Sequence, residues 1–277
     1  MRVSNTQPLL GMPLNHSHPL SQGFVGCWLL NEGGGQIAVN SKGSALLNGG
    51  LTSGTTFKAT QNGIGCNFTG SSYITIPDSD MWSPSASPNQ QWTVSAWVRF
   101  DVVSGSIAVV SKGAASNYEW YIGFETTAGR QLEFLAWNAA GITATRASSN
   151  ITPVVGRWYH LVATMKNTTS TPPTSSIYVN GLFKATDSLT VANTMANGTA
   201  TLRFGNRADA VNFLTGCVNN VMIWQRALSA TEVWQLYTNP YYMFQGYVPT
   251  LVGELINKYK FNNSGIRPRP FAPGLAR

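Results

Sequence analysis

The clearest alternation of hydrophobic and polar residues lies in the last third of the chain, at residues 218–223. Val218, Asn220 and Met222 alternate there with the residues between them, which is the two-residue periodicity of a β-strand. We therefore expect these three side chains on one face of the strand and their neighbours on the other.

A short helix is predicted directly after this strand. Ser229 and Glu232 have the spacing of a capping box, in which each side chain accepts a hydrogen bond from the backbone amide of the other residue. Val233, Leu236 and Tyr237 then fall on one helical face, and Pro240 stops the helix. A strand, a turn and a capped helix in this order are typical of the closing part of a β-sandwich.

Residues 213–237 resemble the end of laminin-G-like domains of the concanavalin-A-like lectin/glucanase superfamily. Those domains carry a glycine, a strand and an aromatic residue, followed by the pattern R-A-L-S-x-x-E-hydrophobic-x-x-L-Y. Six further segments resemble pieces of the same pattern in the same order, so the resemblance covers about residues 23–238. They are residues 23–35, 67–78, 92–98, 158–164, 177–181 and 202–206. The resemblance implies an all-β fold, a two-sheet antiparallel jelly-roll sandwich with one short C-terminal helix.

Two arms flank the predicted sandwich of residues 23–238. Residues 1–22 are expected to form an extended N-terminal arm, and residues 239–277 an aromatic, basic, Pro-rich C-terminal arm. Disordered tails are usually poor in aromatic residues, so these rings are expected to pack against a neighbouring subunit. The predicted interface residues are Tyr241, Tyr242, Phe244, Tyr247, Tyr259, Phe261, Arg267, Arg269 and Phe271. The alternative is that both arms fold back over the edges of the domain's own sheets.

Composition is consistent with one large core. Of the 277 residues, 43% are hydrophobic and 11% aromatic, which is enough to bury a sandwich core without disulfides. Cys27, Cys66 and Cys217 are expected to be small buried residues within strands, although a bond between Cys27 and Cys217 is a further option. No apolar run reaches the roughly 20 residues of a membrane span, and the first residues lack the hydrophobic part of a signal peptide. We therefore expect a soluble chain that is not exported by the classical route.

The net charge of +7 is concentrated near the C-terminus. Five basic residues and one acidic residue give the C-terminal arm a charge of +4; they are Lys258, Lys260, Arg267, Arg269 and Arg277, against Glu254. Elsewhere the basic residues are scattered and form no stripe with aromatic residues, so specific nucleic-acid binding is not expected.

Residues 18–29 resemble the start of such domains in proteins encoded by bacteriophage and prophage genomes. That resemblance implies a virion component. We expect a non-enzymatic structural protein on the capsid surface, a decoration or stabilising subunit whose partners are the major capsid protein and copies of itself. The alternative is a lectin-like adhesin or tail receptor-binding module that binds host-surface glycans.

Residues 131–137 suggest where a carbohydrate would bind. Leu132, Phe134 and Ala136 share one face of the expected strand, opposite Trp137. If the first three side chains face the core, Trp137 and Asn138 form a platform on which a sugar ring could stack. Packing of that second face by the other sheet or by an arm is the alternative.

Catalysis is not expected from this sequence. The superfamily's hydrolases use carboxylates in a Glu-x-Asp-x-(x)-Glu pattern, which is missing, and Glu119 and Glu125 are separated by roughly 20 Å along an extended strand. Glu133 could approach Glu125 across a hairpin turn, which leaves a degenerate glycan hydrolase as a third option. His160 is interpreted as a hydrogen-bonded structural residue on a strand.

Calcium is the inorganic partner that the resemblance implies, held at the sandwich rim by an aspartate and by backbone or asparagine oxygens. The positions where the family carries acidic residues after the late glycine are Asn219 and Asn220 here. Asp209 is therefore the candidate metal ligand, with the Asp78 and Asp80 pair as a further option, and an ordinary turn aspartate is the alternative. No cofactor is required by this interpretation.

Overall fold

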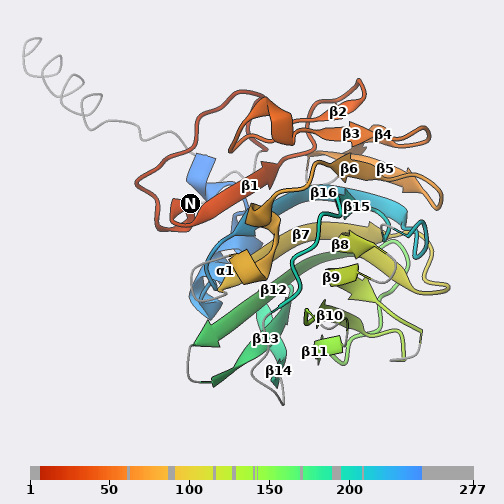
Figure 1. Cartoon of the computed structure of the whole chain (residues 1–277). Coiled ribbons are helices and arrows are strands. Elements are labelled where there is room, and N and C mark those ends of the chain that lie inside the picture. The colour runs from red at the N-terminus through yellow and green to blue at the C-terminus, as the bar shows by residue number, and fades with distance from the viewer. Residues whose placement is uncertain are drawn as a thin grey trace, which may run out of the picture.

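The computed structural model describes residues 7–244 except 61–62, 87–90, 115–116, 127–128, 140, 142, 169–170, 189–194 and 208. Within these residues, two antiparallel β-sheets pack face to face in a sandwich, with a single α-helix beside one of them (Figure 1). The all-β jelly-roll prediction is therefore confirmed, together with the short C-terminal helix.

Sheet A has the strand order β14-β13-β12-β7-β16-β5-β4, with β1 also paired to β16. Its strands are β1 Phe24–Trp28, β4 Thr56–Thr60, β5 Gly63–Thr69, β7 Trp92–Phe100, β12 Trp158–Thr168, β13 Thr171–Val179, β14 Leu182–Ser188 and β16 Thr215–Trp224.

Sheet B has the order β11-β10-β9-β8-β15-β6-β3-β2. Its strands are β2 Ile37–Ala38, β3 Gly49–Leu51, β6 Ile74–Ile76, β8 Ile107–Ala114, β9 Asn117–Phe124, β10 Leu132–Trp137, β11 Thr143–Ser148 and β15 Leu202–Phe204. The helices are α1 Ala230–Thr238 and the short 3₁₀ helices η1 Pro19–Ser21, η2 Ala45–Leu47, η3 Asp80–Trp82, η4 Pro84–Ala86 and η6 Tyr242–Phe244. Of the helices in these described ranges, none has the length and apolar character needed to cross a membrane.

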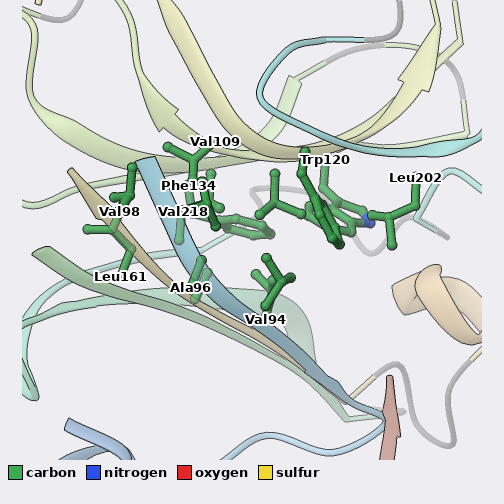
Figure 2. Packing of buried hydrophobic residues seen from close by; sticks show 14 of the residues in the cluster. Val94, Ala96, Val98, Val109, Trp120, Phe134, Leu161, Leu202 and Val218 are labelled. Atoms are coloured by element: carbon green, nitrogen blue, oxygen red, sulfur yellow. The ribbon is translucent and has the colours of Figure 1, made fainter. Parts of the chain in front are cut away.

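The core lies between the two sheets. Side chains of β7, β12 and β16 meet those of β8, β9, β10 and β15 there, as Figure 2 shows for Val94, Leu161 and Val218 on one side and Trp120 and Phe134 on the other. Burial of this apolar surface is the main force that holds the sheets together. Cys66 belongs to this core, and all three cysteines are buried and unpaired, so they are small core residues as predicted and the optional Cys27–Cys217 bond is not formed.

The strand predicted at residues 218–223 lies within β16, but its two faces differ from the prediction. Val218 and Val221 both face the core, whereas Met222 lies on the outer face of sheet A. The reason is a bulge between Val218 and Val221 in the pairing of β16 with β7, which shifts the alternation by one residue. Helix α1 has the predicted capping box, with Ser229 Oγ accepting from the Glu232 amide and the Glu232 carboxylate accepting from the Ser229 amide.

The outer face of sheet A is covered by both ends of the described chain. Met222 and Trp224 of β16 pack there against Leu20, against Val233 of α1, and against Phe244. Hydrogen bonds hold these segments in place: the Trp224 indole donates to the Leu20 carbonyl, and the Asn15 amide donates to the Met243 carbonyl. The described parts of both arms therefore fold back over their own domain, as in the alternative prediction. They cover the outer face of sheet A, however, and not the sheet edges that this alternative named.

The predicted interface residues fall into three groups. Tyr241 and Phe244 are buried within their own chain and are not free to contact a neighbour, because their rings fill the cluster on the outer face of sheet A. Tyr242 is 46% exposed and meets the His18 ring edge-on. Tyr247, Tyr259, Phe261, Arg267, Arg269 and Phe271 lie outside the described residues.

Candidate functional site

The candidate site is the outer face of sheet B, over β9, β10 and β11. Alternation along β10 sends Leu132, Phe134 and Ala136 into the core, as predicted, and Leu135 and Trp137 to the outer face. The outer face contains two linked groups of aromatic and charged side chains. We call them the Tyr118 cluster (Tyr118, Trp137, Arg207 and Asp209) and the Glu133 cluster (Tyr121, Glu125, Glu133, Arg146 and Ser148).

The Tyr118 cluster is centred on an aromatic ring between a guanidinium and an indole. The Arg207 guanidinium lies 4.6 Å from the centroid of the Tyr118 ring, and the Trp137 ring lies 5.2 Å from it. Arg207 also donates to both carboxylate oxygens of Asp209, with Nε to Oδ1 at 3.0 Å and a terminal nitrogen to Oδ2 at 2.9 Å. The Tyr118 hydroxyl donates to the same carboxylate at 3.0 Å. Each polar group in the cluster thus holds another in position.

These contacts perturb the protonation of the cluster in a consistent way. Burial acts to raise the pKa of Asp209, but the hydrogen bonds from Arg207 and Tyr118 outweigh it and the pKa lies below its ordinary value. Burial, and then the bond to the Asp209 carboxylate, raise the pKa of the Tyr118 hydroxyl. Asp209 is therefore an ionised acceptor at neutral pH, and Tyr118 a neutral donor.

The Glu133 cluster joins two carboxylates to one guanidinium. Arg146 donates to Glu125 at 3.0 Å and to Glu133 at 3.0 Å. The Glu133 side chain is fully buried and also accepts from the Ser148 hydroxyl at 3.1 Å. Burial raises the pKa of Glu133, against the opposing effect of Arg146. The predicted approach of Glu133 to Glu125 is thus observed, and Arg146 is the residue through which the two are joined.

Tyr121 connects the two clusters. Its ring lies 5.8 Å from that of Trp137, and its hydroxyl donates to Glu133 at 3.4 Å. The charged side chains that remain partly exposed above this buried layer are Arg146 and Glu125, at 35% and 17%, and Arg207 and Asp209, at 19% and 13%. Tyr118 and Ser148 are partly exposed as well. Charged and hydroxyl groups, rather than ring faces, are therefore what this surface presents to a ligand.

The predicted sugar platform at Trp137 and Asn138 is wrong in the form stated. Trp137 is only 7% exposed because its ring packs between Tyr118 and Tyr121, and Asn138 is 5% exposed and pairs with Met195 through a β-bridge. Trp137 therefore supports the surface from below and does not present a face for stacking. The residues that sequence reasoning missed are Tyr118, Arg146 and Arg207. The spacing of Arg207 and Asp209, two residues apart in one loop, was a local signal for one ion pair, whereas Tyr118 and Arg146 meet their partners only in the folded chain.

The prediction of Asp209 as a calcium ligand does not fit its surroundings either. Both carboxylate oxygens accept from Arg207, and a guanidinium at hydrogen-bond distance repels a divalent cation. The Asp78 carboxylate likewise pairs with Lys112 at 2.9 Å, and Asp80 accepts from the Asn197 amide. Throughout the ranges that the structure describes, no three His, Cys, Asp or Glu side chains gather where they could share an ion.

Asn206, next to Arg207, carries an unsatisfied side chain. It is fully buried, and neither its amide nitrogen nor its oxygen has a hydrogen-bond partner among the described residues. Its backbone carbonyl accepts from the Ser111 hydroxyl on β8 at 2.8 Å. A buried carboxamide without partners destabilises the fold, so a water molecule or a ligand hydroxyl next to it would be stabilising.

Two other buried polar groups serve the fold. Lys112 and Glu119 form a fully buried ion pair, and Glu119 also accepts from the Ser83 hydroxyl at 2.7 Å. Glu119 therefore lies inside the fold and not on an exposed strand face. His160 is buried, hydrogen-bonded to Ser95 at 2.9 Å, and burial lowers its pKa to about 3, so it is a neutral structural residue as predicted.

Comparisons with known proteins agree with this architecture. Residues 68–234 match the family model described as the concanavalin A-like lectin/glucanases superfamily. A search of curated proteins found none that matches this chain.

Solved structures with the same fold include several binding domains. Domain 4 of AbnA, a GH43 extracellular arabinanase from Geobacillus stearothermophilus, solved with arabinotriose, has a TM-score of 0.58 at 16% identity, over 77% of this chain and 98% of that domain. The receptor-binding domain of botulinum neurotoxin type G has a TM-score of 0.54 at 16% identity, over 78% of this chain and 51% of its own. A Trypanosoma rangeli sialidase has a TM-score of 0.56 at 16% identity, over 88% of this chain and 36% of its own. The match thus covers nearly all of AbnA domain 4, but only about half of the neurotoxin domain and about a third of the sialidase.

Proposed function

The chain belongs to the concanavalin A-like lectin/glucanases superfamily, and from this premise we propose that it is a non-enzymatic carbohydrate-binding module whose site is the outer face of sheet B. The observation that carries the proposal is the pair of clusters on that face. Arg146 and Arg207 are fixed donors, Glu125 and Asp209 are fixed acceptors, and all four remain partly exposed. Sugar hydroxyls are recognised by side chains of this kind when they are held rigidly before binding.

The asymmetry of the sandwich supports this choice of face. The outer face of sheet A is covered by the chain's own arms and by α1. Charged and aromatic side chains gather instead on the outer face of sheet B, the sheet farther from α1 in Figure 1. The fold comparison adds support, because AbnA domain 4 was solved with arabinotriose and has the same architecture.

The arrangement of the carboxylates supports a non-enzymatic role. Glu125 and Glu133 both pair with Arg146, and Glu133 is fully buried beneath it. A glycosidase acid or base has to reach the glycosidic oxygen or a water molecule beside it. Glu133 would first have to leave Arg146 and Ser148, so we propose that the pair positions Arg146 instead of acting on a substrate.

Binding of the full chain to a panel of oligosaccharides, measured by isothermal titration calorimetry, tests the proposal. Arg207→Gln removes the bidentate partner of Asp209 and the cation over Tyr118, and we expect it to weaken binding by about tenfold or more. Lys58→Gln is the matched control, because Lys58 is exposed on β4, in the other sheet. If the wild type and Arg207→Gln bind with equal affinity, and circular dichroism shows that both are folded, the binding site lies elsewhere. If the wild type binds no oligosaccharide of the panel, the proposal is refuted.

A second candidate function is that of a bacteriophage virion subunit on the capsid surface, with the major capsid protein and copies of itself as partners. The resemblance of residues 18–29 to phage-encoded proteins motivates it. The specific observation in its favour is how the described chain ends: Tyr241 and Phe244 are anchored on the domain, and the basic, aromatic residues 245–277 follow directly. Because Phe244 is held on the domain, the position from which residues 245–277 could reach a neighbouring subunit is fixed.

Deletion of residues 245–277 tests the virion proposal. The truncation has to start after Phe244, because Tyr241 and Phe244 are part of the folded domain. We expect the shortened chain to keep its unfolding midpoint and to lose incorporation into phage particles, measured by mass spectrometry of purified particles. Full incorporation of the truncated chain would count against a clamp made by this segment.

A further inference from the structure

The charge balance of the candidate site bears on which glycans it accepts, an inference that rests on the proposed function. We infer that the outer face of sheet B binds uncharged, hydroxyl-rich oligosaccharides and discriminates against chains that carry sialic or uronic acid. Recognition of a sugar carboxylate normally depends on a guanidinium that is free to pair with it. The two guanidinium groups at the centre of this face are already paired.

Arg207 is neutralised within its own loop. Two of its nitrogens donate to the two oxygens of Asp209, at 3.0 and 2.9 Å, and its plane lies over the Tyr118 ring. The hydrogen bonds that lower the Asp209 pKa keep this carboxylate ionised at neutral pH. A sugar carboxylate would have to displace Asp209 from a bidentate contact or lie beside it as a like charge, and both are unfavourable.

Arg146 is neutralised more completely. One nitrogen pairs with Glu125 at 3.0 Å, another with Glu133 at 3.0 Å, and its backbone amide donates to the Asp187 carboxylate at 2.6 Å. Two carboxylates therefore pair with this guanidinium, and a third accepts from the backbone amide of the same residue, where β11 meets β14. Carboxylates accept hydrogen bonds from sugar hydroxyls but repel an anion, so this end of the face favours an uncharged sugar.

Two other arginines near this face could instead form a site that accepts acidic glycans. Arg130 is exposed at the hairpin before β10, and Arg203 on β15 lies 4.4 Å from the Tyr73 ring centroid. In the described part of the chain, neither forms an ion pair with a carboxylate. Arg203 lies two strands from β9, at about 10 Å, so a site that accepts acidic chains would be centred there and away from the two clusters.

Paired oligosaccharides test the inference. The full chain is titrated with a galactose-terminated tetrasaccharide and with the same chain ending in one sialic acid, and with xylo-oligosaccharides with and without a glucuronic acid branch. We expect the uncharged member of each pair that binds to bind about tenfold more tightly. Raising the salt concentration should reduce this preference without changing the affinity of the uncharged member, because screening acts on the repulsion alone.

Three variants test whether the preference for uncharged glycans depends on the proposed residues. Glu125→Gln removes a partly exposed negative charge beside Arg146 and should reduce the preference at least threefold by improving binding of the acidic chain. Arg130→Gln and Arg203→Gln should leave the preference unchanged. Acidic chains that bind as tightly as their uncharged partners, or an acidic affinity that Arg203→Gln abolishes, would overturn the inference while leaving carbohydrate binding intact. Binding of neither member of any pair would overturn the proposed function and the inference with it.

Discussion

At the scale of single residues, the sequence identified which side chains are buried better than what they contact. His160 was interpreted correctly from strand alternation, because a polar residue on a strand between apolar neighbours usually has a buried partner. Arg207 and Asp209 were not recognised as a pair, and neither was the contact of Arg207 with Tyr118, which is distant in the sequence. Contacts of that kind depend on the fold and leave no local periodicity.

The first prediction concerns the pH dependence that His160 gives to stability. Burial lowers its pKa to about 3 in the folded chain, from an ordinary value of 6.5. The unfolded chain therefore takes up a proton first as the pH falls, and the stability that His160 contributes above pH 6.5 is lost towards pH 3. Between pH 7 and pH 5 this loss is about 2 kcal/mol.

Urea unfolding of the wild type and of His160→Gln across this pH range measures the effect. The variant lacks the titrating ring, so we expect the stability gap between the two proteins to narrow by about 2 kcal/mol as the pH falls from 7 to 5. His16→Gln is the control for the loss of a histidine at an exposed position. A gap that is the same at both pH values for His160→Gln would show that the ring does not stay neutral in the folded chain.

At the scale of elements, periodicity predicted the strands around residues 218–223 and 131–137, capping predicted the helix, and the family resemblance supplied the other strand segments. The helix was predicted well because its capping box and its terminating proline are local signals that need no tertiary context. The two faces of β16 were not predicted correctly, because the bulge between Val218 and Val221 belongs to the pairing with β7, and the sequence alone shows only alternation. The same limit explains the mistaken platform: the strand at Trp137 was predicted correctly, but the rings that cover it come from β9.

The second prediction concerns the attachment of the C-terminal segment to sheet A. The Tyr241 hydroxyl donates to the Asn219 side chain at 2.6 Å, and both residues are buried. Asn219 thus occupies a position where an acidic calcium ligand was considered, and it serves as an acceptor for the arm. We expect Tyr241→Phe to lower the free energy of unfolding by about 1–2 kcal/mol, because it removes the buried hydrogen bond to Asn219 and the one that the hydroxyl accepts from the Asn220 side chain.

Urea unfolding and hydrogen exchange of residues 239–244 measure this attachment. Tyr242→Phe is the matched control, since its ring is 46% exposed, and it should change stability by less than about 0.5 kcal/mol. Equal effects of the two substitutions would mean that the buried hydroxyl contributes no more than an exposed one.

At the scale of the whole molecule, the sandwich separates two surfaces with different roles. The outer face of sheet A is occupied by the two arms, and the outer face of sheet B carries the clusters proposed to bind glycans. Between them lies the continuous core of Figure 2, in which large side chains of both sheets are fully buried. Packed sheets lie about 10 Å apart, so substitutions on the two outer faces are separated by more than the distance over which their effects on stability usually couple.

The third prediction follows from this separation. Arg207→Gln and Tyr241→Phe alter opposite faces, share no partner and should act independently. We expect the loss of stability in the double variant to equal the sum of the single losses within about 0.5 kcal/mol. Tyr241→Phe alone should leave oligosaccharide affinity within about twofold of the wild type. A coupling above about 1 kcal/mol, or a clear loss of affinity in Tyr241→Phe, would instead mean that the state of the arms is communicated through the sheets to the glycan-binding face.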